Sequence, residues 1–578
     1  MLQSRMPNQK QEKTFLSQFG RSGETAEFFS PIPEGYQQGK TRYVVVLGTV
    51  MSGLGKGIFS SSLAKLLQDK GLTVTPVKLE GYLNIDSGTL NPFRHGEVFV
   101  LDDGTETDMD LGTYERILDQ NLSRLNFTTA GQIYSTVLDK ERLGDYLGET
   151  VQVIPHITDE IKRRIEAVNS KKNIDVIITE VGGTVGDIEG QPFYEAIRQL
   201  ILEKGKENSL VIHTTLLPFI SAAGEIKTKP TQHSVMRLRE IGLEPDTLVC
   251  RTEDENHLTN KLKNKLGLFC NIEKSHVFES PDVETIYEIP LVLYKQGFDN
   301  AICKRLCLGN KRHKNIAALE KFIHSYKNPK STVNIAMCGK YNSLHDAYKS
   351  ILEALIHAGV ENVSKINIKW IDTEKLEKKK NKIKDFFKDI NGVIIPGGFG
   401  DRGIEGKILS SKYARENNIP FLGICLGLQC AVIDYSRNVC NFKDANSTEF
   451  KKNIKYPVID LMHTQIGVNK KGATMRLGSY KCNVKQRTKA YSAYKQLVVH
   501  ERHRHRYEVN NNFVNDLKKN GLVISGVNEK LNLVEMIEIK KHPWFVGVQF
   551  HPELKSRVVK AHPLFKDFIA AAIKNNGK

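Results

Sequence analysis

The sequence lacks the apolar run of a membrane span, because no stretch of about 18 apolar residues occurs in it. Its first residues, MLQSRMPNQKQEKTFLSQFG, lack the apolar core of a secretory signal. The nine cysteines include no C-x-x-C pair, which argues against a zinc site or a disulfide framework. These absences predict a cytoplasmic protein with reduced thiols and no membrane partner.

Charge of one sign is in surplus, with 83 Lys and Arg against 66 Asp and Glu and a net charge of +17. Nucleic-acid binders have such a surplus, but here the lysines are scattered and no nucleic-acid motif is present. The surplus therefore favours a surface for small anionic molecules over a nucleic-acid partner. The length predicts roughly two to four domains.

Strand-like and helix-like stretches alternate along most of the chain and predict two α/β blocks with parallel sheets. Strands are expected at Thr73–Leu79 and Ile174–Val181, for example, and helices at Glu149–Val168 and Gln191–Lys204. The expected division is a flexible extension over 1–40, a first α/β domain over 41–308, a linker over 309–330, a second α/β domain over 331–565 and a tail over 566–578.

The stretch Tyr43–Gly57 reads YVVVLGTVMSGLGKG, a β-branched run that ends in a glycine-rich turn and a lysine. A helical spacing follows, so a strand, a tight loop and a helix are expected. Backbone N–H groups in such a loop form an anion site, to which Lys56 adds a charge. The pattern G-x-x-x-x-G-K-[ST] is not met, because Gly48 lies two residues early and Gly57 replaces the Mg²⁺-binding hydroxyl. We predict a phosphate-binding loop, with a structural glycine turn as the alternative.

The second half contains IPFLGICLGLQ, in which an apolar run enters the motif G-x-C-x-G at Cys425. This pattern is typical of a nucleophile elbow, with sulfur in place of oxygen. A sharp turn from strand to helix exposes the side chain, and a helix N-terminus favours the thiolate form of a cysteine. The alternative is a buried structural cysteine beside two glycines.

Near the C-terminus, WFVGVQFHPE puts His551 and Glu553 just after the expected last strand. A cysteine nucleophile needs a histidine that takes and returns its proton, and a carboxylate that orients the histidine. Pro396–Gly400 follows another strand, and its N–H groups are expected to form an oxyanion hole with that of Leu426. We therefore predict a triad of Cys425, His551 and Glu553.

The first half contains two acidic segments, HGEVFVLDDGTETDMDLGTYERIL and ITEVGGTVGDIEG, and a basic turn, GEIKTKPTQHSV. Asp110 and Glu180 lie near glycine-rich turns, where their oxygens are candidate ligands for Mg²⁺. Residues of the basic turn suit a second triphosphate: Lys227, Thr228, Lys229, Thr231 and Gln232. Each segment alone is equally compatible with a solvated acidic loop or a basic surface turn.

GICLGLQ, QFHPE and PGGFG together resemble the class I glutamine amidotransferase family. The resemblance implies that Cys425 attacks the glutamine amide, releases ammonia and leaves a thioester, which water hydrolyses with help from His551. It also gives a role to the basic stretch Glu501–Arg506, which taken alone is open to interpretation as an RNA patch. The implied glutamine contacts are Gly398, Leu426, Gly427, Leu428, Gln429, Glu449 and Arg506.

With the segments of the first half added, the chain from about Thr41 to residue 560 resembles the CTP synthase family. The resemblance implies that ATP phosphorylates the 4-oxygen of UTP, that ammonia from glutamine displaces the phosphate, and that CTP forms. It implies ATP and Mg²⁺ as cofactors and an ammonia channel whose exit lies near His95 and Val98. The implied fold is α/β, with an N-terminal P-loop-like parallel-sheet synthetase domain and a C-terminal class I glutamine amidotransferase domain.

The same resemblance implies nucleotide and metal contacts. Lys56 and Lys78 would lie near the transferred phosphate, and Asp110 and Glu180 would bind Mg²⁺. The implied ATP contacts are Ser52, Gly53, Leu54, Gly55, Lys56, Gly57, Ile58, Lys78, Asp110, Asp282 and Val283. The implied contacts of UTP, or of CTP as feedback inhibitor, are Ser52, Asp187, Ile188, Glu189, Lys227, Thr228, Lys229, Pro230, Thr231, Gln232 and Lys265.

Regulation and assembly are implied in the same way: activation by GTP with a lid around Arg402 and Gly403, a homotetramer, and filaments of stacked tetramers. The chain departs from the family pattern at Gly53, where a serine is usual, and at Gly81, where a proline is common. Two alternatives stay open. One is an amidotransferase with another acceptor, and the other is a filament or RNA-binding protein with vestigial sites.

Overall fold

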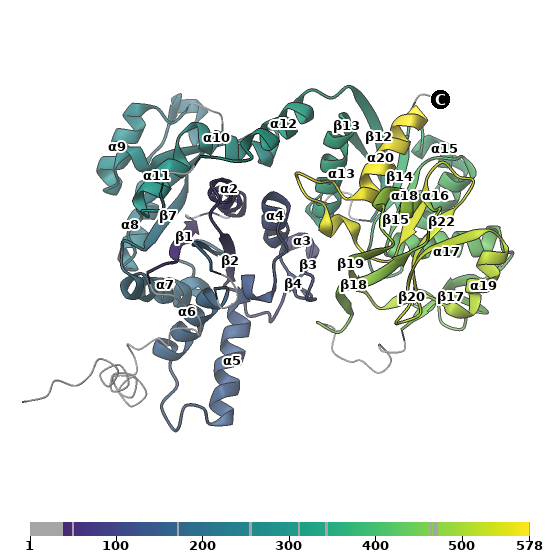
Figure 1. The fold of residues 1–578 in the computed structure, drawn as a ribbon, viewed down its shortest axis with the longest axis horizontal. Helices are drawn as coiled ribbons and strands as arrows, with labels where there is room; N and C mark the ends of the chain where they lie inside the picture. Colours follow the sequence, from purple (N-terminus) through teal and green to yellow (C-terminus); the bar gives the residue numbers. More distant parts are fainter. Residues whose placement is uncertain are drawn as a thin grey trace, which may run out of the picture. The chain divides into compact units, whose positions relative to one another are not determined.

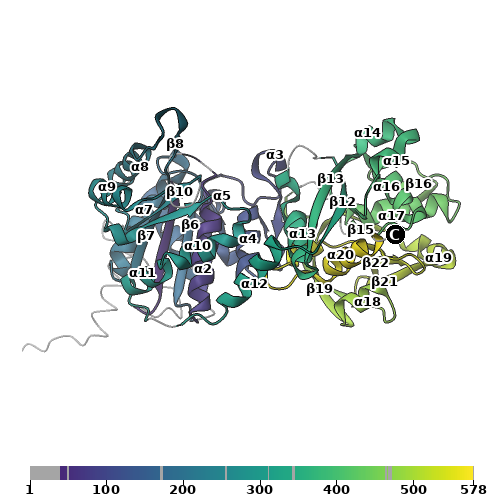
Figure 2. The ribbon, with the colours of Figure 1, turned by 90° about the horizontal axis from the view of Figure 1, so that it is seen from above.

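The structure, a computed structural model, describes residues 39–576 except 49, 50, 52, 170–172, 254–256, 310, 311, 341–344, 463, 464 and 466–471. The chain divides into two units, which Figures 1 and 2 show as ribbons. The N-terminal unit runs to Ile85 and resumes over Arg124–Ile316. The C-terminal unit comprises Asp86–Ser123, here called the inserted segment, and the chain from Ala317 onward. The expected first domain, 41–308, thus contains a segment that packs with the C-terminal unit, and residues 1–38 lie outside the described residues.

A parallel sheet forms the centre of the N-terminal unit, with strands in the order β11-β10-β7-β1-β6-β2-β5. Its central strands are rich in β-branched residues and are buried on both faces, which is typical of parallel sheets covered by helices. The expected parallel α/β fold is confirmed. The strands are β1 (Arg42–Gly48), β2 (Val74–Glu80), β5 (Phe127–Thr129), β6 (Val176–Val181), β7 (Ser209–Leu216), β10 (Thr247–Thr252) and β11 (Val277–Pro281).

The main helices of this unit are α2 (Lys56–Asp69), α5 (Ala130–Leu143), α6 (Thr158–Ala167), α7 (Gln191–Lys204), α8 (Lys229–Glu240), α9 (Asn260–Cys270), α10 (Ile289–Lys295) and α11 (Phe298–Arg305). Figure 1 shows α2 on one face of the sheet and α6 and α7 on the other. Helix α7 has the predicted bounds. The helix predicted over 149–168 is wrong in its first half, because Ile154 precedes Pro155 and has extended backbone angles (φ −110°, ψ 124°).

The C-terminal unit contains a nine-stranded sheet in the order β13-β12-β14-β15-β23-β22-β21-β18-β19. The strands from β13 to β23 are parallel, as expected, whereas the remaining four pair antiparallel and were not predicted. The strands are β12 (Ser331–Gly339), β13 (Ser364–Asp372), β14 (Gly392–Ile395), β15 (Phe421–Ile424), β18 (Arg476–Val484), β19 (Val498–His505), β21 (Leu522–Asn528), β22 (Leu533–Ile539) and β23 (Phe545–Val548). A smaller sheet pairs β16 (Ala445–Ser447), β17 (Tyr456–Leu461) and β20 (Tyr507–Val509).

Helices replace parts of the expected linker and tail. The segment 309–330 contains α12 (Ile316–Lys327), and 566–576 belongs to α20 (Pro563–Asn576). Phe568 and Ile569 of α20 are fully buried, so the expected tail is part of the core. The other main helices of the unit are α13 (Lys349–Glu361), α14 (Thr373–Lys378), α15 (Ile383–Phe386), α16 (Ile404–Glu416), α17 (Leu426–Asn438), α18 (Lys489–Tyr494) and α19 (Asn511–Lys519). Within the described ranges, no helix is both long and apolar enough to cross a membrane.

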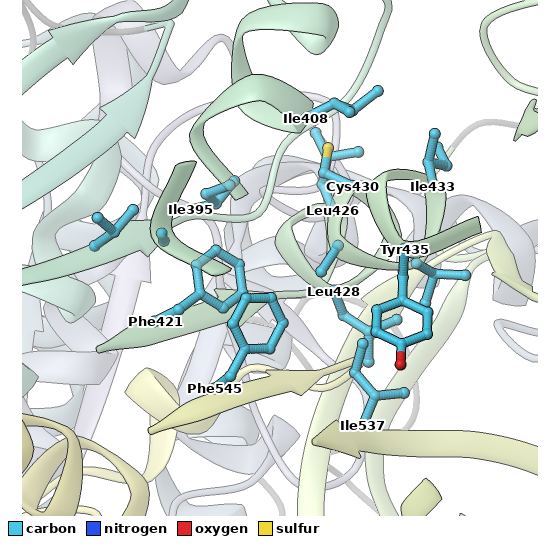
Figure 3. Close-up of a cluster of buried hydrophobic side chains, with 14 of the residues drawn as sticks. Ile395, Ile408, Phe421, Leu426, Leu428, Cys430, Ile433, Tyr435, Ile537 and Phe545 are labelled. Atoms are coloured by element: carbon cyan, nitrogen blue, oxygen red, sulfur yellow. The ribbon is translucent and has the colours of Figure 1, made fainter. Parts of the chain in front are cut away.

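A buried apolar cluster holds β15 and β23 against α17, as Figure 3 shows. The rings of Phe421 and Phe545 stack on these neighbouring strands with their centroids 4.3 Å apart. Leu426 and Leu428 of α17 and Ile395 of β14 belong to the same cluster and are almost fully buried. The turn between β15 and α17, at Cys425, is therefore built on a rigid base.

The inserted segment is fixed to its unit by buried ion pairs. It contains α3 (Pro92–His95), β3 (Phe99–Val100), β4 (Glu106–Thr107) and α4 (Met109–Leu118). Glu115 of α4 accepts hydrogen bonds from both terminal nitrogens of Arg502 at 2.8 and 3.0 Å and from Arg557 at 2.9 Å. The Glu115 and Arg502 side chains are both 0% exposed, so each charge depends on the other.

Removing Glu115 should destabilise the C-terminal unit strongly. The Glu115→Ala variant leaves the buried Arg557 without a paired carboxylate among the described residues and leaves Arg502 with Asp102 alone, which costs about 3–5 kcal/mol and lowers the unfolding temperature by roughly 10 °C. The control is Lys566→Ala, which breaks a half-exposed pair with Glu361 and should change stability by about 0–1 kcal/mol. Equal unfolding temperatures of the two variants in a thermal melt would contradict this account.

Candidate active site

The predicted phosphate loop joins β1 to α2. Gly53 and Gly55 have φ angles of 79° and 78°, a left-handed conformation that favours glycine. Lys56 opens α2, and its Nζ donates a hydrogen bond to the carbonyl oxygen of Gly183 at 2.6 Å. A Cβ at Gly48 would lie 2.6 Å from this Nζ. Gly48, two residues early for the standard motif, thus leaves room for the lysine side chain.

The remaining expected ATP contacts have different positions. Leu54 lies in the loop, and Gly57 and Ile58 lie in the first turn of α2, where free N–H groups favour anions. Asp282 and Val283 directly follow β11. Ser52 lies outside the described residues.

Lys78 of β2 lies between two carboxylates. Its Nζ is 2.7 Å from Oε1 of Glu180 on β6 and 3.2 Å from Oε1 of Glu80. Lys78 and Glu180 are 3% and 1% exposed. A Cβ at Gly182 would lie 2.6 Å from both carboxylate oxygens of Glu80, so the glycine leaves space for this group. Oxygen donors of this kind suit Mg²⁺, whereas the other expected ligand, Asp110, belongs to the C-terminal unit.

The basic turn forms the N-terminus of α8. Thr228 is the N-cap residue, and Lys229 to Gln232 make up the first helical turn, with Pro230 at its start. Gln232 Nε2 donates to Thr228 Oγ1 at 3.1 Å, and Lys227 pairs with Glu225. Helix α8 therefore supplies N–H groups beside two lysines, which is a suitable site for phosphates.

The other expected UTP contacts lie at the turn after β6 and on α9. The Asp187 carboxylate accepts hydrogen bonds from the backbone N–H and the hydroxyl of Thr184, both at 2.7 Å, and so fixes this turn. Ile188 and Glu189 follow in a short 3₁₀ turn, and Lys265 lies on α9. Sequence reasoning missed Arg251 of β10, which donates to the Gly53 carbonyl oxygen at 3.0 Å and pairs with Asp282 at 2.7 Å.

Cys425 occupies the predicted sharp turn between β15 and α17. Its backbone angles are φ 51° and ψ −101°, a strained conformation for a residue with a side chain. A Cβ at Gly427 would lie 2.1 Å from the carbonyl oxygen of Ile395, and one at Gly423 would lie 2.7 Å from the carbonyl carbon of Gly427. Both glycines of G-x-C-x-G are therefore required by close packing, and the thiol projects from a rigid elbow.

His551 and Glu553 follow β23, as expected. His551 Nδ1 donates a hydrogen bond to Glu553 Oε1 at 2.7 Å, so its Nε2 is directed away from Glu553. A Cβ at Gly397 would lie 2.8 Å from Cε1 of His551 and 3.6 Å from Cβ of Cys425, which puts histidine and cysteine beside the same glycine. Burial alone lowers the pKa of His551, but Glu553 and Cys425 favour the imidazolium and raise the pKa to about 10.

A cavity of about 120 Å³ opens onto this triad. Gly397, Gly398 and Phe399 of the predicted oxyanion segment line it together with Cys425 and His551. The inserted segment lines it too, through Glu97 and Val98, the latter expected near the ammonia channel. Burial raises the pKa of Glu97 to about 7, against the opposing effects of Arg116 and Ser350. No motif around Glu97 indicated this position.

Three of the side chains expected to contact glutamine form hydrogen bonds with other residues of the protein. Gln429 Nε2 donates to the Tyr507 carbonyl oxygen at 3.0 Å, and Glu449 Oε1 accepts from the Gly400 N–H at 3.0 Å. Arg506 donates to Thr474 Oγ1 at 2.8 Å. Leu426, Gly427 and Leu428 form the first turn of α17. Sequence reasoning missed Gln549, whose Nε2 lies 3.7 Å from the Cys425 sulfur.

Comparison with known proteins links both units to one family. Residues 42–308 match the CTP synthase N-terminus family, and residues 343–571 match the class-I glutamine amidotransferase family. The CTP synthase of Clostridium kluyveri is 54% identical over 541 residues, which cover 93% of this chain and 99% of the relative. That of Caldanaerobacter subterraneus subsp. tengcongensis is 54% identical over 92% of this chain and 98% of the relative.

The chain belongs to the CTP synthase family. A solved structure of the Trypanosoma brucei CTP synthase glutaminase domain with bound acivicin is 39% identical, with a TM-score of 0.40, and covers 42% of this chain and 94% of that domain. As a CTP synthase family member with both domains, the chain is a ligase that aminates UTP with ATP and with nitrogen from glutamine.

Replacing Glu553 should shift the alkaline limb of the pH profile of glutamine hydrolysis to lower pH. In Glu553→Gln, the carboxylate that favours the imidazolium is lost, so the pKa of His551 falls from about 10. Because the leaving ammonia takes its proton from His551, glutamine-driven activity should decline at lower pH than in the wild type. The measurement is kcat/KM for glutamine against pH. Ammonia-driven CTP formation is the control and should keep its profile, and an unshifted alkaline limb would contradict the role of Glu553.

Proposed function

We propose that the C-terminal unit hydrolyses glutamine at Cys425. The thiolate attacks the amide carbon, and the imidazolium of His551 gives its proton to the leaving nitrogen, so that ammonia departs and a thioester remains. Neutral His551 then takes a proton from water, which hydrolyses the thioester to glutamate and restores the thiol. Glu553 orients the ring throughout. The observation that carries this proposal is the strained Cys425 elbow beside His551, with His551 bonded to Glu553 at 2.7 Å.

When the thiolate attacks, negative charge develops on the amide oxygen of glutamine, and preorganised hydrogen-bond donors stabilise it. We assign this role to the N–H groups of Gly398 and Leu426. Two features support it: Gly398 borders the same cavity as Cys425, and Leu426 is the first residue of α17. Leu426, Gly427 and Leu428 would then carry the glutamine amide on the first turn of α17. Arg506 and Glu449 are the candidates for the α-carboxylate and the α-ammonium of glutamine, with Gln429 behind them.

The N-terminal unit is proposed to phosphorylate UTP. The loop from Ser52 to Ile58 would hold the phosphates of ATP, with Lys56 and Lys78 at the transferred group and Asp282 and Val283 at adenine. Lys227 to Gln232, Lys265 and Asp187 to Glu189 would hold UTP. Phosphoryl transfer depends mostly on positioning and charge neutralisation, which Lys56 at the first position of α2 and the buried Lys78 would provide. Ammonia then displaces phosphate from C4 of the uracil.

Glu180 and Asp110 are the proposed protein ligands of Mg²⁺. Glu180 Oε1 lies 2.7 Å from Lys78 Nζ, and Gly182 leaves room for the carboxylate of Glu80. The N-terminal unit therefore brings two carboxylates together, and carboxylate oxygens are the ligands that Mg²⁺ prefers. When bound, the ion supplies charge neutralisation for the transferred phosphate. Lys78 would orient the carboxylates of Glu80 and Glu180.

Further properties are proposed from family membership: residues 41–308 as the synthetase domain, 331–565 as the amidotransferase domain, inhibition by CTP, activation by GTP, and a cytoplasmic location. A homotetramer is also proposed, and an exposed apolar surface at the end of α5 and after it supports self-association: Leu143, Leu147, Val153 and Ile154 are 42–91% exposed. The mass of the purified protein in solution tests this, and a monomer at every concentration would exclude it.

The main test compares two nitrogen sources. Cys425→Ala should lose CTP formation from glutamine by at least about 10³-fold and keep that from added ammonia, because only the first needs the thiolate. The matched control is Cys430→Ala, which replaces a buried cysteine of α17, the helix that follows Cys425, and should keep both activities. CTP is measured chromatographically with ATP, UTP and Mg²⁺ present.

Lys56→Ala should lose both activities, since phosphoryl transfer precedes amination with either nitrogen source. Glutamine use by Cys425→Ala would show that the nucleophile is misassigned. If the wild type forms no CTP from either source, the proposed function fails.

A further inference from the structure

Five ionisable side chains form a buried group in the C-terminal unit, close to the triad. Arg476 comes from β18, His503 and His505 from β19, Glu508 from β20 and Glu535 from β22. All five are at most 5% exposed. The glutamine-hydrolysis mechanism uses none of them, although burying so many charges is costly unless they are paired.

The two histidines have a fixed hydrogen-bond direction. His505 Nδ1 lies 3.1 Å from the carbonyl oxygen of Tyr507, which accepts only, so this nitrogen carries the hydrogen. Burial, Arg476 and His551 keep the pKa values of both rings well below their usual range, so both rings are neutral. His505 Nε2 is then an acceptor, and His503 Nδ1 donates to it at 2.8 Å. His503 Nε2 is left as a bare lone pair.

That lone pair faces a carboxylate oxygen. His503 Nε2 and Glu535 Oε2 lie 3.5 Å apart, and neither has a hydrogen-bond partner in the described part of the chain. Two buried acceptors in this position repel each other unless one carries a proton. Because both rings are neutral, the proton belongs on Glu535, whose other oxygen accepts from Arg476 at 2.6 Å.

The charge balance between Arg476 and the two carboxyl groups also favours a proton on Glu535. Arg476 also donates to Glu508 at 3.0 Å, so one guanidinium faces two carboxylates. Burial raises the pKa values of both Glu508 and Glu535, against the opposing effect of Arg476, so this pair of carboxyl groups favours holding one proton. The other groups that face this cluster are Tyr480 and Cys482 of β18, Glu501 of β19, and His551. None of them adds a positive charge except His551 in its protonated form.

The opposite end of this chain of hydrogen bonds reaches the nucleophile. The Tyr507 carbonyl oxygen, which accepts from His505, also accepts from Gln429 Nε2 at 3.0 Å. Gln429 Nε2 lies 3.4 Å from Gln549 Oε1, and Gln549 Nε2 lies 3.7 Å from the Cys425 sulfur. Hydrogen bonds therefore connect His503 through His505, the Tyr507 carbonyl and two glutamines to Cys425, and Glu535 lies 3.5 Å from the far end of this chain.

We propose that Glu535, in its protonated form, is a positioning residue for glutamine hydrolysis. Its proton orders His503 and His505, which hold the Tyr507 carbonyl in place for Gln429. Glu508 remains ionised and balances Arg476. The proposal rests on the assignment of Cys425 as the nucleophile and adds a requirement for one buried proton, which the triad alone does not have.

Two isosteric variants separate the carboxylates. In Glu535→Gln, the amide N–H replaces the acid proton and the amide oxygen still accepts from Arg476, so kcat/KM for glutamine should stay within about twofold of wild type. In Glu508→Gln, the positive charge of Arg476 favours ionised Glu535, which releases its proton. Glutamine-driven kcat/KM should then fall roughly tenfold or more at about pH 8 and recover as the pH is lowered, because Glu535 takes the proton back.

Ammonia-driven CTP formation by the same preparations reports whether each variant is folded, and it should be unchanged. If Glu508→Gln does not fold, Glu535→Leu replaces it, since it has neither donor nor acceptor and should show a tenfold loss that pH does not rescue. The proposal is overturned if Glu535→Gln loses as much activity as Glu508→Gln, or if the loss in Glu508→Gln does not depend on pH. Glutamine use by Cys425→Ala, by contrast, would overturn the assignment of the nucleophile and not the protonation of Glu535.

Discussion

The buried contact between Arg502 and Glu115 is the interaction on which the glutamine site depends. It fixes the inserted segment in the C-terminal unit, and this segment lines the cavity over Cys425 with Glu97 and Val98. The backbone of the same arginine serves the triad directly, because the Arg502 carbonyl oxygen accepts from the His551 N–H at 2.8 Å. One strand, β19, thus supports the cavity wall, the catalytic base and the histidine pair. A buried ion pair of this kind adds little net stability, but the loss of one partner alone leaves a costly buried charge.

Burial changes the interpretation of the basic stretch Glu501–Arg506, which the sequence alone leaves open as an RNA patch. Arg502 and His503 are 0% exposed, and Arg504 pairs with Glu106 at 2.8 Å. The charges of the two arginines are therefore paired inside the C-terminal unit. Ionisable side chains also occupy buried positions of β19 where a half-buried strand usually has apolar ones, because Glu501, Arg502 and His503 are buried in succession. This is the physical reason why β19 was not predicted.

Sequence reasoning predicted the local structure correctly where it depends on short-range spacing. The loop at Lys56, the elbow at Cys425 and the His551–Glu553 pair are local motifs, and a parallel α/β order follows from alternating strands and helices. It failed where a role depends on residues distant in the chain. Arg251 contacts Gly53 across 198 positions, and Gln549 meets Cys425 across 124, so no local pattern contains either pair. The helix predicted over 149–168 failed for a local reason, because Pro155 excludes helical angles at Ile154.

The central claim is that nitrogen released from glutamine at Cys425 is the nitrogen that enters CTP. Its most direct test supplies glutamine labelled with ¹⁵N in the amide group together with an excess of unlabelled ammonium at about neutral pH, where little free ammonia is present. The 4-amino nitrogen of CTP is then examined by mass spectrometry. The account predicts mostly ¹⁵N-labelled CTP from the wild type. CTP that carries only unlabelled nitrogen, while labelled glutamine is hydrolysed, would contradict it.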